Sequence, residues 1–140
     1  PSNRQALSPA QTMTIPAAQD TDTLSSAVLK SGEEYVVKAY GTADACIFGC
    51  GYSIFFDPEY STSDGTTWVD GVAAPYVSYG PNLLDLMVNG GYVGWGAFSP
   101  THTYTNTVAG ADVPLALRVN DVFYPNNSGN LSADISVKLW

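Results

Sequence analysis

Two segments near the end of the chain alternate apolar and polar residues, and a long connection separates them. The first, "VPLALRVND" (113 to 121), places Leu115, Leu117 and Val119 on one face. The second, "NLSADISVKLW" (130 to 140), does the same with Leu131, Ala133, Ile135, Val137 and Leu139. This period is typical of strands with one buried face. We expect the two strands to pair antiparallel. The eight residues between them, 122 to 129, exceed the usual hairpin loop of about two to five, so the loop needs a further reason.

The rest of the chain indicates the same fold class. Short apolar or alternating runs, bounded by Gly, Pro, Asn and Asp, predict further strands at 35 to 43, 51 to 60, 83 to 90, 91 to 98 and 102 to 110. Only 13% of the residues are charged, and Gly, Thr, Ser and Tyr are abundant. We predict an all-β protein, a two-sheet antiparallel β-sandwich of jelly-roll-like form, with residues 23 to 140 as its single domain.

Two segments do not read as core strands. Residues 1 to 22 contain three Pro and one short alternation, Met13 and Ile15, which predicts an extended arm followed by an edge strand. The arm either folds back on its own domain or lies on a neighbouring subunit, and the second option predicts a homo-oligomer or larger assembly. Residues 57 to 82 are polar and rich in Gly and Pro. We expect them to form a long irregular loop with a functional or interface role.

The charge distribution excludes some partners. The formal net charge is −8, and the five Lys and Arg residues are dispersed along the chain. A protein that binds nucleic acid needs clustered basic residues to neutralise phosphates. No run approaches the roughly 18 apolar residues of a membrane-spanning helix. We therefore expect neither nucleic-acid binding nor membrane insertion.

The two cysteines, Cys46 and Cys50, lie four residues apart in "ACIFGC". A local disulfide is feasible if their Cα atoms come within about 7 Å. Two small buried thiols are the alternative. A zinc site is not expected, because two Cys and the single His102 are too few ligands.

An enzymatic function finds little support in the residues. His102 is the only histidine, and we expect it to be a surface residue rather than a general base. The carboxylate pairs Asp57 with Glu59 and Asp64 with Asp70 are candidates for acid–base work on a glycoside. They fall in the predicted loop, however, where solvated acids are commoner. We predict a non-catalytic protein.

The loop that begins at Asp121 carries the ligand types that Ca²⁺ prefers. Asp121 offers a carboxylate, Asn126 and Asn127 offer amide oxygens, and the carbonyls between Phe123 and Pro125 lie between them. Calcium takes about six to eight such oxygens. Because one carboxylate under-neutralises the ion, sugar hydroxyls could complete the site. Alternatively, Asp, Asn and Gly are here simply as turn residues.

Exposed aromatic rings are the second resource for binding a sugar, because their faces stack on apolar C–H groups. Tyr124 lies inside the Asp121 loop and is the preferred candidate. Trp68, flanked by "GTT" and "VDG", is the second.

The segment "VNDVFYPNNSGNLSADISV" resembles the C-terminal part of the small bacterial calcium-dependent galactose-binding lectins. In these a strand ends in Asn-Asp, the loop carries paired Asn before Ser-Gly, and an alternating strand closes the sandwich. Similar endings occur in extracellular and phage β-sandwich modules. The resemblance implies that Ca²⁺ and the sugar are held by Asp121, Asn126 and Asn127, with a loop carbonyl near Phe123 or Tyr124 and an oxygen from Asp44 or Ala45 in "GTADA".

Two functions follow from these patterns. The first is a lectin-like protein that binds carbohydrate or a glycan surface through Ca²⁺. The second is a structural subunit, such as a virion decoration protein, whose arm contacts its neighbours. Both predict a location outside the cell, on a cell surface or on a virion surface.

Overall fold

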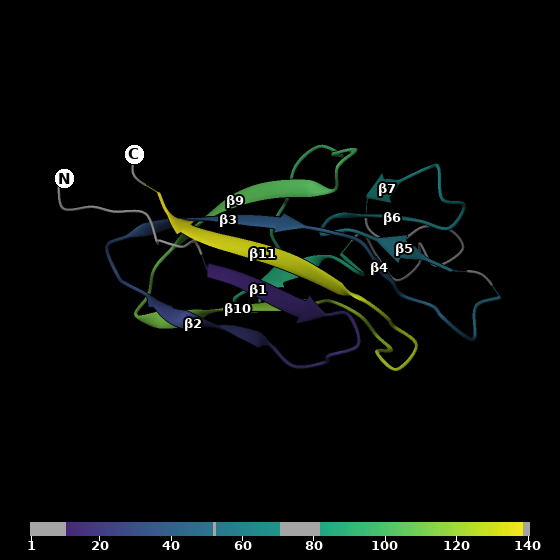
Figure 1. Ribbon diagram of the computed structural model, residues 1–140, viewed down its shortest axis with the longest axis horizontal. Coiled ribbons are helices and arrows are strands. Elements are labelled where there is room, and N and C mark those ends of the chain that lie inside the picture. Colours follow the sequence, from purple (N-terminus) through teal and green to yellow (C-terminus); the bar gives the residue numbers. More distant parts are fainter. Residues whose placement is uncertain (1–10, 52, 71–81, 139–140) are drawn as a thin grey trace.

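The computed structural model describes residues 11–51, 53–70 and 82–138, which form strands and turns without an α-helix. The strands make three antiparallel sheets (Figure 1). In order, the first sheet contains β1 (Gln11–Pro16), β11 (Asn130–Val137), β3 (Glu34–Tyr40) and β9 (Thr103–Ala109). The second contains β2 (Thr23–Leu29), β10 (Val113–Val119) and β8 (Leu86–Val88). A small sheet contains β4 (Ala43–Asp44), β5 (Phe55–Phe56), β6 (Tyr60–Thr62) and β7 (Val69–Asp70).

The first and second sheets pack against each other around one hydrophobic core. Alternating side chains of β10 and β11 point into it and are fully buried: Leu115, Leu117, Val119, Leu131, Ala133 and Ile135. Burying such side chains is the main source of stability, at about 1.5 to 3 kcal/mol for each large one. The predicted all-β, two-sheet antiparallel sandwich is confirmed.

The predicted pairing of the last two long strands is wrong. β10 lies between β2 and β8 in the second sheet, whereas β11 lies between β1 and β3 in the first. An alternating pattern shows that one face is buried but does not show which sheet the strand joins. Packed sheets are about 10 Å apart, and residues 120 to 129 cross this distance. The length of the loop is therefore that of a crossing between sheets.

The strand predicted at 91 to 98 is also wrong. Asn89 and Gly90 both have positive φ, 51° and 77°, as a tight hairpin turn requires. Only one bridge follows, between Val88 and Gly91. The chain then leaves the sheet, and Trp95 is buried with its indole N–H donating to Leu86 O at 3.0 Å.

Short strands replace two other expected features. The strand predicted at 51 to 60 is reduced to β5. The predicted irregular loop 57 to 82 contains β6 and β7, which pair with each other and, through β6, with β5. The part of this loop from 71 to 81 lies outside the described residues. Two of the four strands of the small sheet therefore lie where an irregular loop was expected.

β1 is an edge strand of the first sheet. It pairs with β11 along its whole length, from Gln11 opposite Ile135 to Pro16 opposite Asn130. Residues 1 to 10 of the predicted arm lie outside the described part of the chain. None of the described segments forms a helix that is long and apolar enough to cross a membrane.

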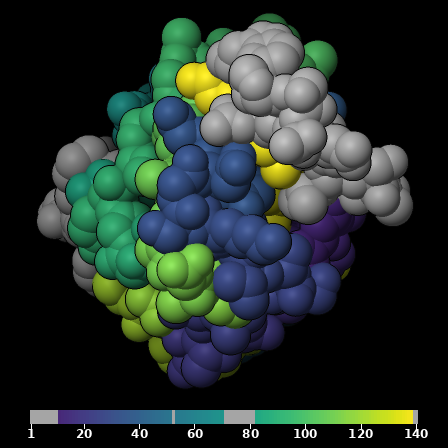
Figure 2. Space-filling model, turned by 90° about the vertical axis from the view of Figure 1, so that its left-hand side faces the viewer, coloured from purple at the N-terminus to yellow at the C-terminus, as the bar shows by residue number. Residues whose placement is uncertain are grey.

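The two ends of the sandwich differ. At one end, shown in Figure 2, the β2–β3 and β9–β10 turns lie side by side, joined by a 2.9 Å hydrogen bond from Ser31 N to Asp112 Oδ1. At the other end the small sheet lies beside the 120–129 loop (Figure 1). Most of the polar residues singled out from the sequence are at this second end.

Candidate functional site

The 120–129 loop is held against the segment that follows β3. Asp44 and Ser128 exchange two backbone hydrogen bonds of 3.0 and 2.8 Å. Ile47 N donates to Asn126 O at 2.9 Å. The structure therefore brings "GTADA" beside the paired asparagines, although the two segments are far apart in sequence.

Asp121 organises the start of this loop. Its Oδ1 accepts hydrogen bonds from the backbone N–H groups of Val122 at 2.6 Å and Phe123 at 3.2 Å. Its Oδ2 accepts a 2.7 Å bond from Asn127 Nδ2. Burial raises the pKa of Asp121, and these hydrogen bonds act in the opposite direction. The carboxylate thus fixes the loop and supplies its one negative charge.

The orientation of Asn127 is determined by its two hydrogen bonds. The side chain is buried, and its Nδ2 donates to Asp121 Oδ2 at 2.7 Å and to Ala17 O at 2.8 Å. A primary amide has two N–H donors, so both are used. The remaining oxygen, Oδ1, is directed toward Asn126.

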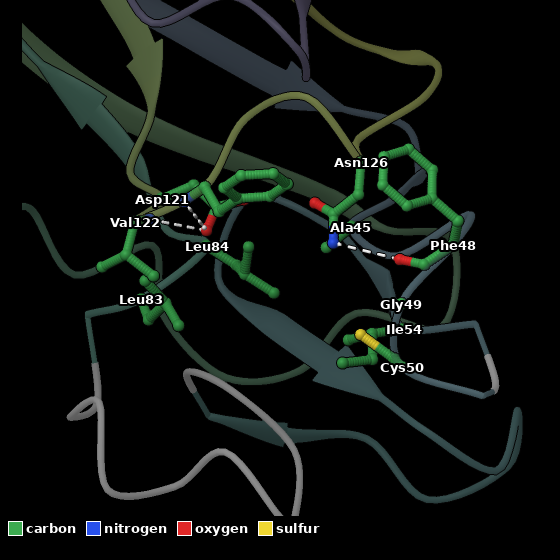
Figure 3. Close-up of a pocket in the computed structure, with 11 residues that line it drawn as sticks. Ala45, Phe48, Gly49, Cys50, Ile54, Leu83, Leu84, Asp121, Val122 and Asn126 are labelled. Atoms are coloured by element: carbon green, nitrogen blue, oxygen red, sulfur yellow. Dashed lines mark hydrogen bonds between the residues drawn. The ribbon is translucent and has the colours of Figure 1, made fainter.

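Oxygen atoms converge on the side chain of Asn126. In Figure 3 its nitrogen faces Phe48 O at 3.4 Å, which is a weak contact. The other amide position lies 2.9 Å from Phe123 O, 3.0 Å from Ala45 O and 3.1 Å from Asn127 Oδ1. All three are acceptors. With oxygen in this position, Asn126 completes a group of four oxygens; with nitrogen there, the amide donates to its neighbours.

The other two residues expected to bind the metal have partners of their own. The Tyr124 hydroxyl donates to Val119 O at 2.6 Å and accepts from Asp121 N at 3.1 Å. Asp44 Oδ1 accepts from Cys46 N at 2.8 Å. These groups hold the backbone of the two segments. The oxygen of "GTADA" that approaches Asn126 is the Ala45 carbonyl.

A disulfide joins Cys46 and Cys50, whose Cα atoms are 6.1 Å apart. The small loop that it closes presents Ile47 and Phe48, each more than half exposed. This loop forms one wall of a pocket of about 410 Å³ (Figure 3). The pocket is largely apolar, and its lining includes Ile54, Leu83, Leu84, Phe123, Asp121 and Asn126. A ligand in it would touch both apolar side chains and the oxygen-rich loop.

Trp68 lies in a separate group of rings. Its ring centroid is 5.8 Å from that of Phe98, with the two rings stacked, and 4.5 Å from that of His102. It is not among the described residues that line the pocket. Trp68 and the Asp121 loop therefore offer two distinct surfaces.

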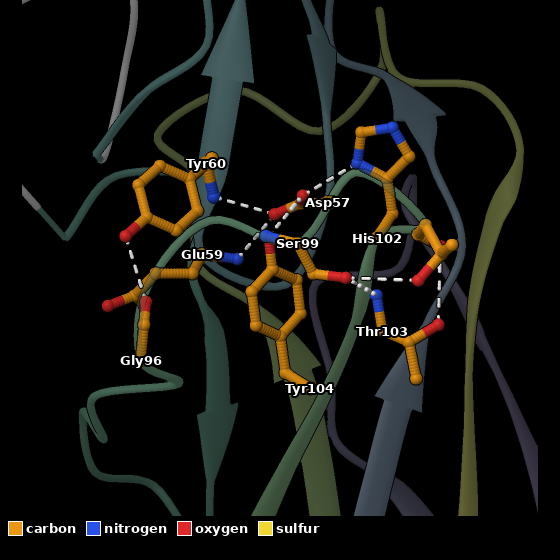
Figure 4. Close-up of polar contacts among 9 residues, drawn as sticks. Asp57, Glu59, Tyr60, Gly96, Ser99, His102, Thr103 and Tyr104 are labelled. Carbon is orange, nitrogen blue, oxygen red and sulfur yellow. Dashed lines mark hydrogen bonds and ion pairs between the residues drawn. The ribbon is translucent and has the colours of Figure 1, made fainter.

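His102 and Asp57 differ from what the sequence indicated. His102 is only 22% exposed in its side chain, and its Nδ1 lies 2.8 Å from Asp57 Oδ2. Asp57 is fully buried and also accepts hydrogen bonds from Glu59 N, Tyr60 N and the Tyr104 hydroxyl (Figure 4). Both carboxylate oxygens of Asp57 accept hydrogen bonds. Asp57 therefore connects β9 to the turn that precedes β6.

Three further acids form a cluster that sequence reasoning missed. One oxygen each from Glu59, Asp70 and Asp85 lies within 4.8 Å of the others, so these residues could hold a metal. Burial, followed by the charge of Asp70, raises the pKa of Glu59 to about 7. Burial, followed by the charge of Glu59, raises that of Asp85 to about 9. Asp64, by contrast, has a lowered pKa because the backbone N–H groups of Thr67 and Thr66 bond to it.

The sequence singled out Glu59 and Asp70, each in a different pair, but did not join them to Asp85. Glu59 and Asp85 are distant along the chain and meet because Leu86 N donates to Pro58 O at 3.0 Å. The useful hint was the single acid in the apolar run "LLDLMV". A carboxylate in such a run needs a partner when it is buried.

The chain matches no protein-family model and no curated protein sequence. Among solved structures it is similar to one described as "EclA N-terminal domain; PllA-like lectin", with a TM-score of 0.54 and 15% sequence identity. The likeness covers 91% of this chain and 96% of that chain. At this identity it shows the fold, which is a lectin-like β-sandwich.

Proposed function

We propose that the protein is a non-catalytic lectin that binds carbohydrate through Ca²⁺ held in the 120–129 loop. The observation that carries the proposal is the convergence of oxygens at Asn126. Its amide position has three acceptors within 3.1 Å: Phe123 O, Ala45 O and Asn127 Oδ1. The lectin-like fold supports the same function.

A cation accounts for this arrangement better than an amide nitrogen does. An NH₂ group has two hydrogens, which is one too few for three acceptors. Oxygens that bind Ca²⁺ lie about 2.3 to 2.6 Å from the ion, and neighbours in such a shell are about 3 Å apart. The three oxygens lie at this distance from the Asn126 amide position, at 2.9 to 3.1 Å. Asn127 cannot turn its nitrogen inward without losing its bonds to Asp121 and Ala17.

The candidate ligands are mainly neutral. Asn126, Asn127, Phe123 and Ala45 contribute amide or carbonyl oxygens, and Asp121 contributes the one negative charge beside them. A dication with this shell keeps positive charge and open coordination positions. Bound Ca²⁺ would supply an attachment point for two neighbouring sugar hydroxyls.

The residues beside the loop suit the apolar C–H face of a sugar whose hydroxyls bind the ion. The adjoining pocket is apolar, and its volume of about 410 Å³ falls in the range of small-molecule sites. Phe123 and Phe48 are both about half exposed at its border. Trp68, stacked on Phe98, offers a second contact for a larger glycan, and Tyr124 keeps the loop in shape.

The proposal is tested by calorimetry with Ca²⁺ and by glycan-array binding, each with and without EGTA. Asn126→Ala should lose calcium binding in the 120–129 loop and glycan binding while keeping the far-UV circular dichroism spectrum. Asp20→Asn changes an exposed residue elsewhere and serves as the control. Glycan binding that is unchanged in excess EGTA would contradict the proposal.

One observation favours the alternative of an assembly subunit, such as a virion decoration protein. The outer face of the second sheet carries two apolar side chains that are more than half exposed, Leu24 and Val28. Such a patch suits a subunit contact. Light scattering after size exclusion tests this directly: a homo-oligomer that dissociates on Val28→Asp supports it, and a monomer at all concentrations contradicts it. Either function fits a location outside the cell, on a cell surface or on a virion.

A further inference from the structure

A second set of oxygens comes from residues beside β6, β7 and β8 and includes none of the loop residues. Glu59 precedes β6, Asp70 ends β7, and Asp85 precedes β8. One carboxylate oxygen of each lies within 4.8 Å of the others. Figure 4 shows Glu59 beside the turn that Asp57 organises.

Two of these carboxylates are buried with an oxygen that has no hydrogen-bond partner. Asp85 is 3% exposed and Glu59 is 8% exposed. Asp85 Oδ1 and Glu59 Oε2 are both buried and unpartnered. The charged groups that act on Asp85 are themselves acids: Glu59, Asp70 and Asp57. Buried charges in proteins are normally paired or coordinate a metal, so these two need an additional partner.

We propose that Glu59, Asp70 and Asp85 form a second divalent-cation site, separate from the loop, whose ion is Ca²⁺. The set consists of carboxylates only, which favours a hard cation over Zn²⁺. All three oxygens lie within 4.8 Å of one another, and the flexible coordination geometry of Ca²⁺ accommodates such a set more readily than the strict octahedron of Mg²⁺.

The backbone supports this assignment. Leu84 has a φ of 73°, an unfavourable value for a residue with a branched side chain. Hydrogen bonds hold the segment in this conformation, from Leu84 N to Asn120 O at 2.6 Å and from Asn120 N to Asp85 O at 2.9 Å. This conformation directs Asp85 inward. Asp70 is exposed on β7, which leaves the ion a route from solvent.

The ion would add a link between the small sheet and the sandwich, beside the hydrogen bond from Leu86 N to Pro58 O. β6 and β7 belong to the small sheet, whereas Asp85 leads into the second sheet of the sandwich. Binding would fix the small sheet to the sandwich. It would also hold β7, which begins directly after Trp68, in place. The site therefore has a structural role, whether or not the loop binds sugar.

The competing explanation is a proton shared between Asp85 and Glu59, with no ion. Calorimetry in the Asn126→Ala background distinguishes the two, because the loop set is broken there. We expect this variant still to bind one Ca²⁺ per chain, and Asp85→Asn added to it to abolish binding. If Asn126→Ala alone binds no Ca²⁺, or if Asp85→Asn leaves the remaining isotherm unchanged, the second site is excluded.

A variant at the exposed ligand covers the case in which Asp85→Asn does not fold. In the same background, Asp70→Asn should weaken Ca²⁺ binding at least about tenfold. The matched control is Asp20→Asn, which removes the same charge from an exposed position and should leave the affinity unchanged. Equal weakening by both substitutions would mean that only the overall charge matters and would overturn the proposal.

Discussion

Asp57 and Asp85 are two buried aspartates in neighbouring segments, and they differ in their hydrogen-bond donors. Asp57 is fully buried and receives bonds from two backbone N–H groups, the Tyr104 hydroxyl and His102. Asp85 is nearly as buried, at 3% exposed, but its Oδ1 has no donor. The same residue type at similar depth thus has two roles. A carboxylate with all its donors holds the fold together, whereas one without them is a candidate ligand.

The 120–129 loop shows both situations within a few residues. The Asn127 side-chain nitrogen donates a 2.7 Å hydrogen bond to Asp121 Oδ2, so both groups have a partner. Around the side-chain amide of Asn126, by contrast, three acceptors converge: Phe123 O, Ala45 O and Asn127 Oδ1. The difference between the two kinds of oxygen is the number of nearby hydrogen-bond donors. Oxygens that accept hydrogen bonds hold the fold together, and those without a donor are the candidate ligands, whatever their burial or charge.

The largest effect is expected at Asp57. Asp57→Ala removes the acceptor of four donors, two of them backbone groups, and leaves them buried without a partner. We expect the free energy of unfolding to fall by about 3 kcal/mol, measured by urea denaturation. A loss below about 1 kcal/mol would contradict the structural role. Asp64→Ala, at an exposed turn, is the matched control and should cost less.

The next effect is expected at Asn127. Asn127→Leu keeps the side-chain size but removes the donor to Asp121 Oδ2 and Ala17 O. We expect a loss of about 2 kcal/mol in unfolding free energy together with loss of calcium binding to the loop. Asn106→Leu is the control: it removes two hydrogen bonds at a more exposed position, one to Gly94 O and one from Thr107 N, and should cost less than half as much. Retained loop calcium binding would separate Asn127 from the ligand set.

A smaller effect concerns pH and the acidic cluster. In EGTA the folded chain holds protons on Asp85 and Glu59, whose pKa values are about 9 and about 7, compared with 3.8 and 4.5 for the ordinary groups. At a pH between the ordinary and the raised pKa values, the unfolded chain binds fewer protons than the folded chain. The free energy of unfolding therefore falls as the pH rises. Solvent near Asp70 screens the charges, and we expect a loss of about 1.5 kcal/mol between pH 5 and pH 8.

Thermal unfolding at the two pH values measures this dependence. The double variant Glu59→Gln/Asp85→Asn should lose most of it, and Ca²⁺ should reduce it in the unaltered protein. An identical pH dependence in both proteins would show that the cluster is not its origin.

The smallest effect is expected at Trp68. If its ring provides a second sugar contact, Trp68→Ala should weaken binding of an oligosaccharide by about 1 kcal/mol and leave the Ca²⁺ affinity of the loop unchanged. Tyr92→Ala, at another exposed aromatic residue, is the control. Equal affinities for the Trp68 variant and the unaltered protein would remove Trp68 from the binding surface.

The sequence predicted the strands better than their partners. Alternation located β9, β10 and β11 to within three residues at each end, because each buries one face. Alternation could not assign β10 and β11 to different sheets, because the buried face of each strand lines the same hydrophobic core. At 91 to 98 the sequence contains apolar residues between glycines, a pattern that resembles a strand. In the structure this segment is irregular, and Trp95 fills the core from it.

The candidate site was predicted in part for a similar reason. Asp121, Asn126 and Asn127 lie within one short loop, where residue types alone suggest a shared role. Glu59, Asp70 and Asp85 come from three separate elements that only the tertiary structure brings together. Their burial depends on the packing of the small sheet, which no local pattern reports.

The central position of β11 has a consequence for how the chain is made. This strand pairs with β1 on one side and β3 on the other, in contacts that join residues as far apart as Gln11 and Ile135. During synthesis, β1 and the open edge of β3 emerge long before residues 130 to 137 leave the ribosome. Until then each presents unpaired backbone groups that can join the wrong strand. Such distant pairing also slows folding, so production of the protein should benefit from a chaperone that shields these edges.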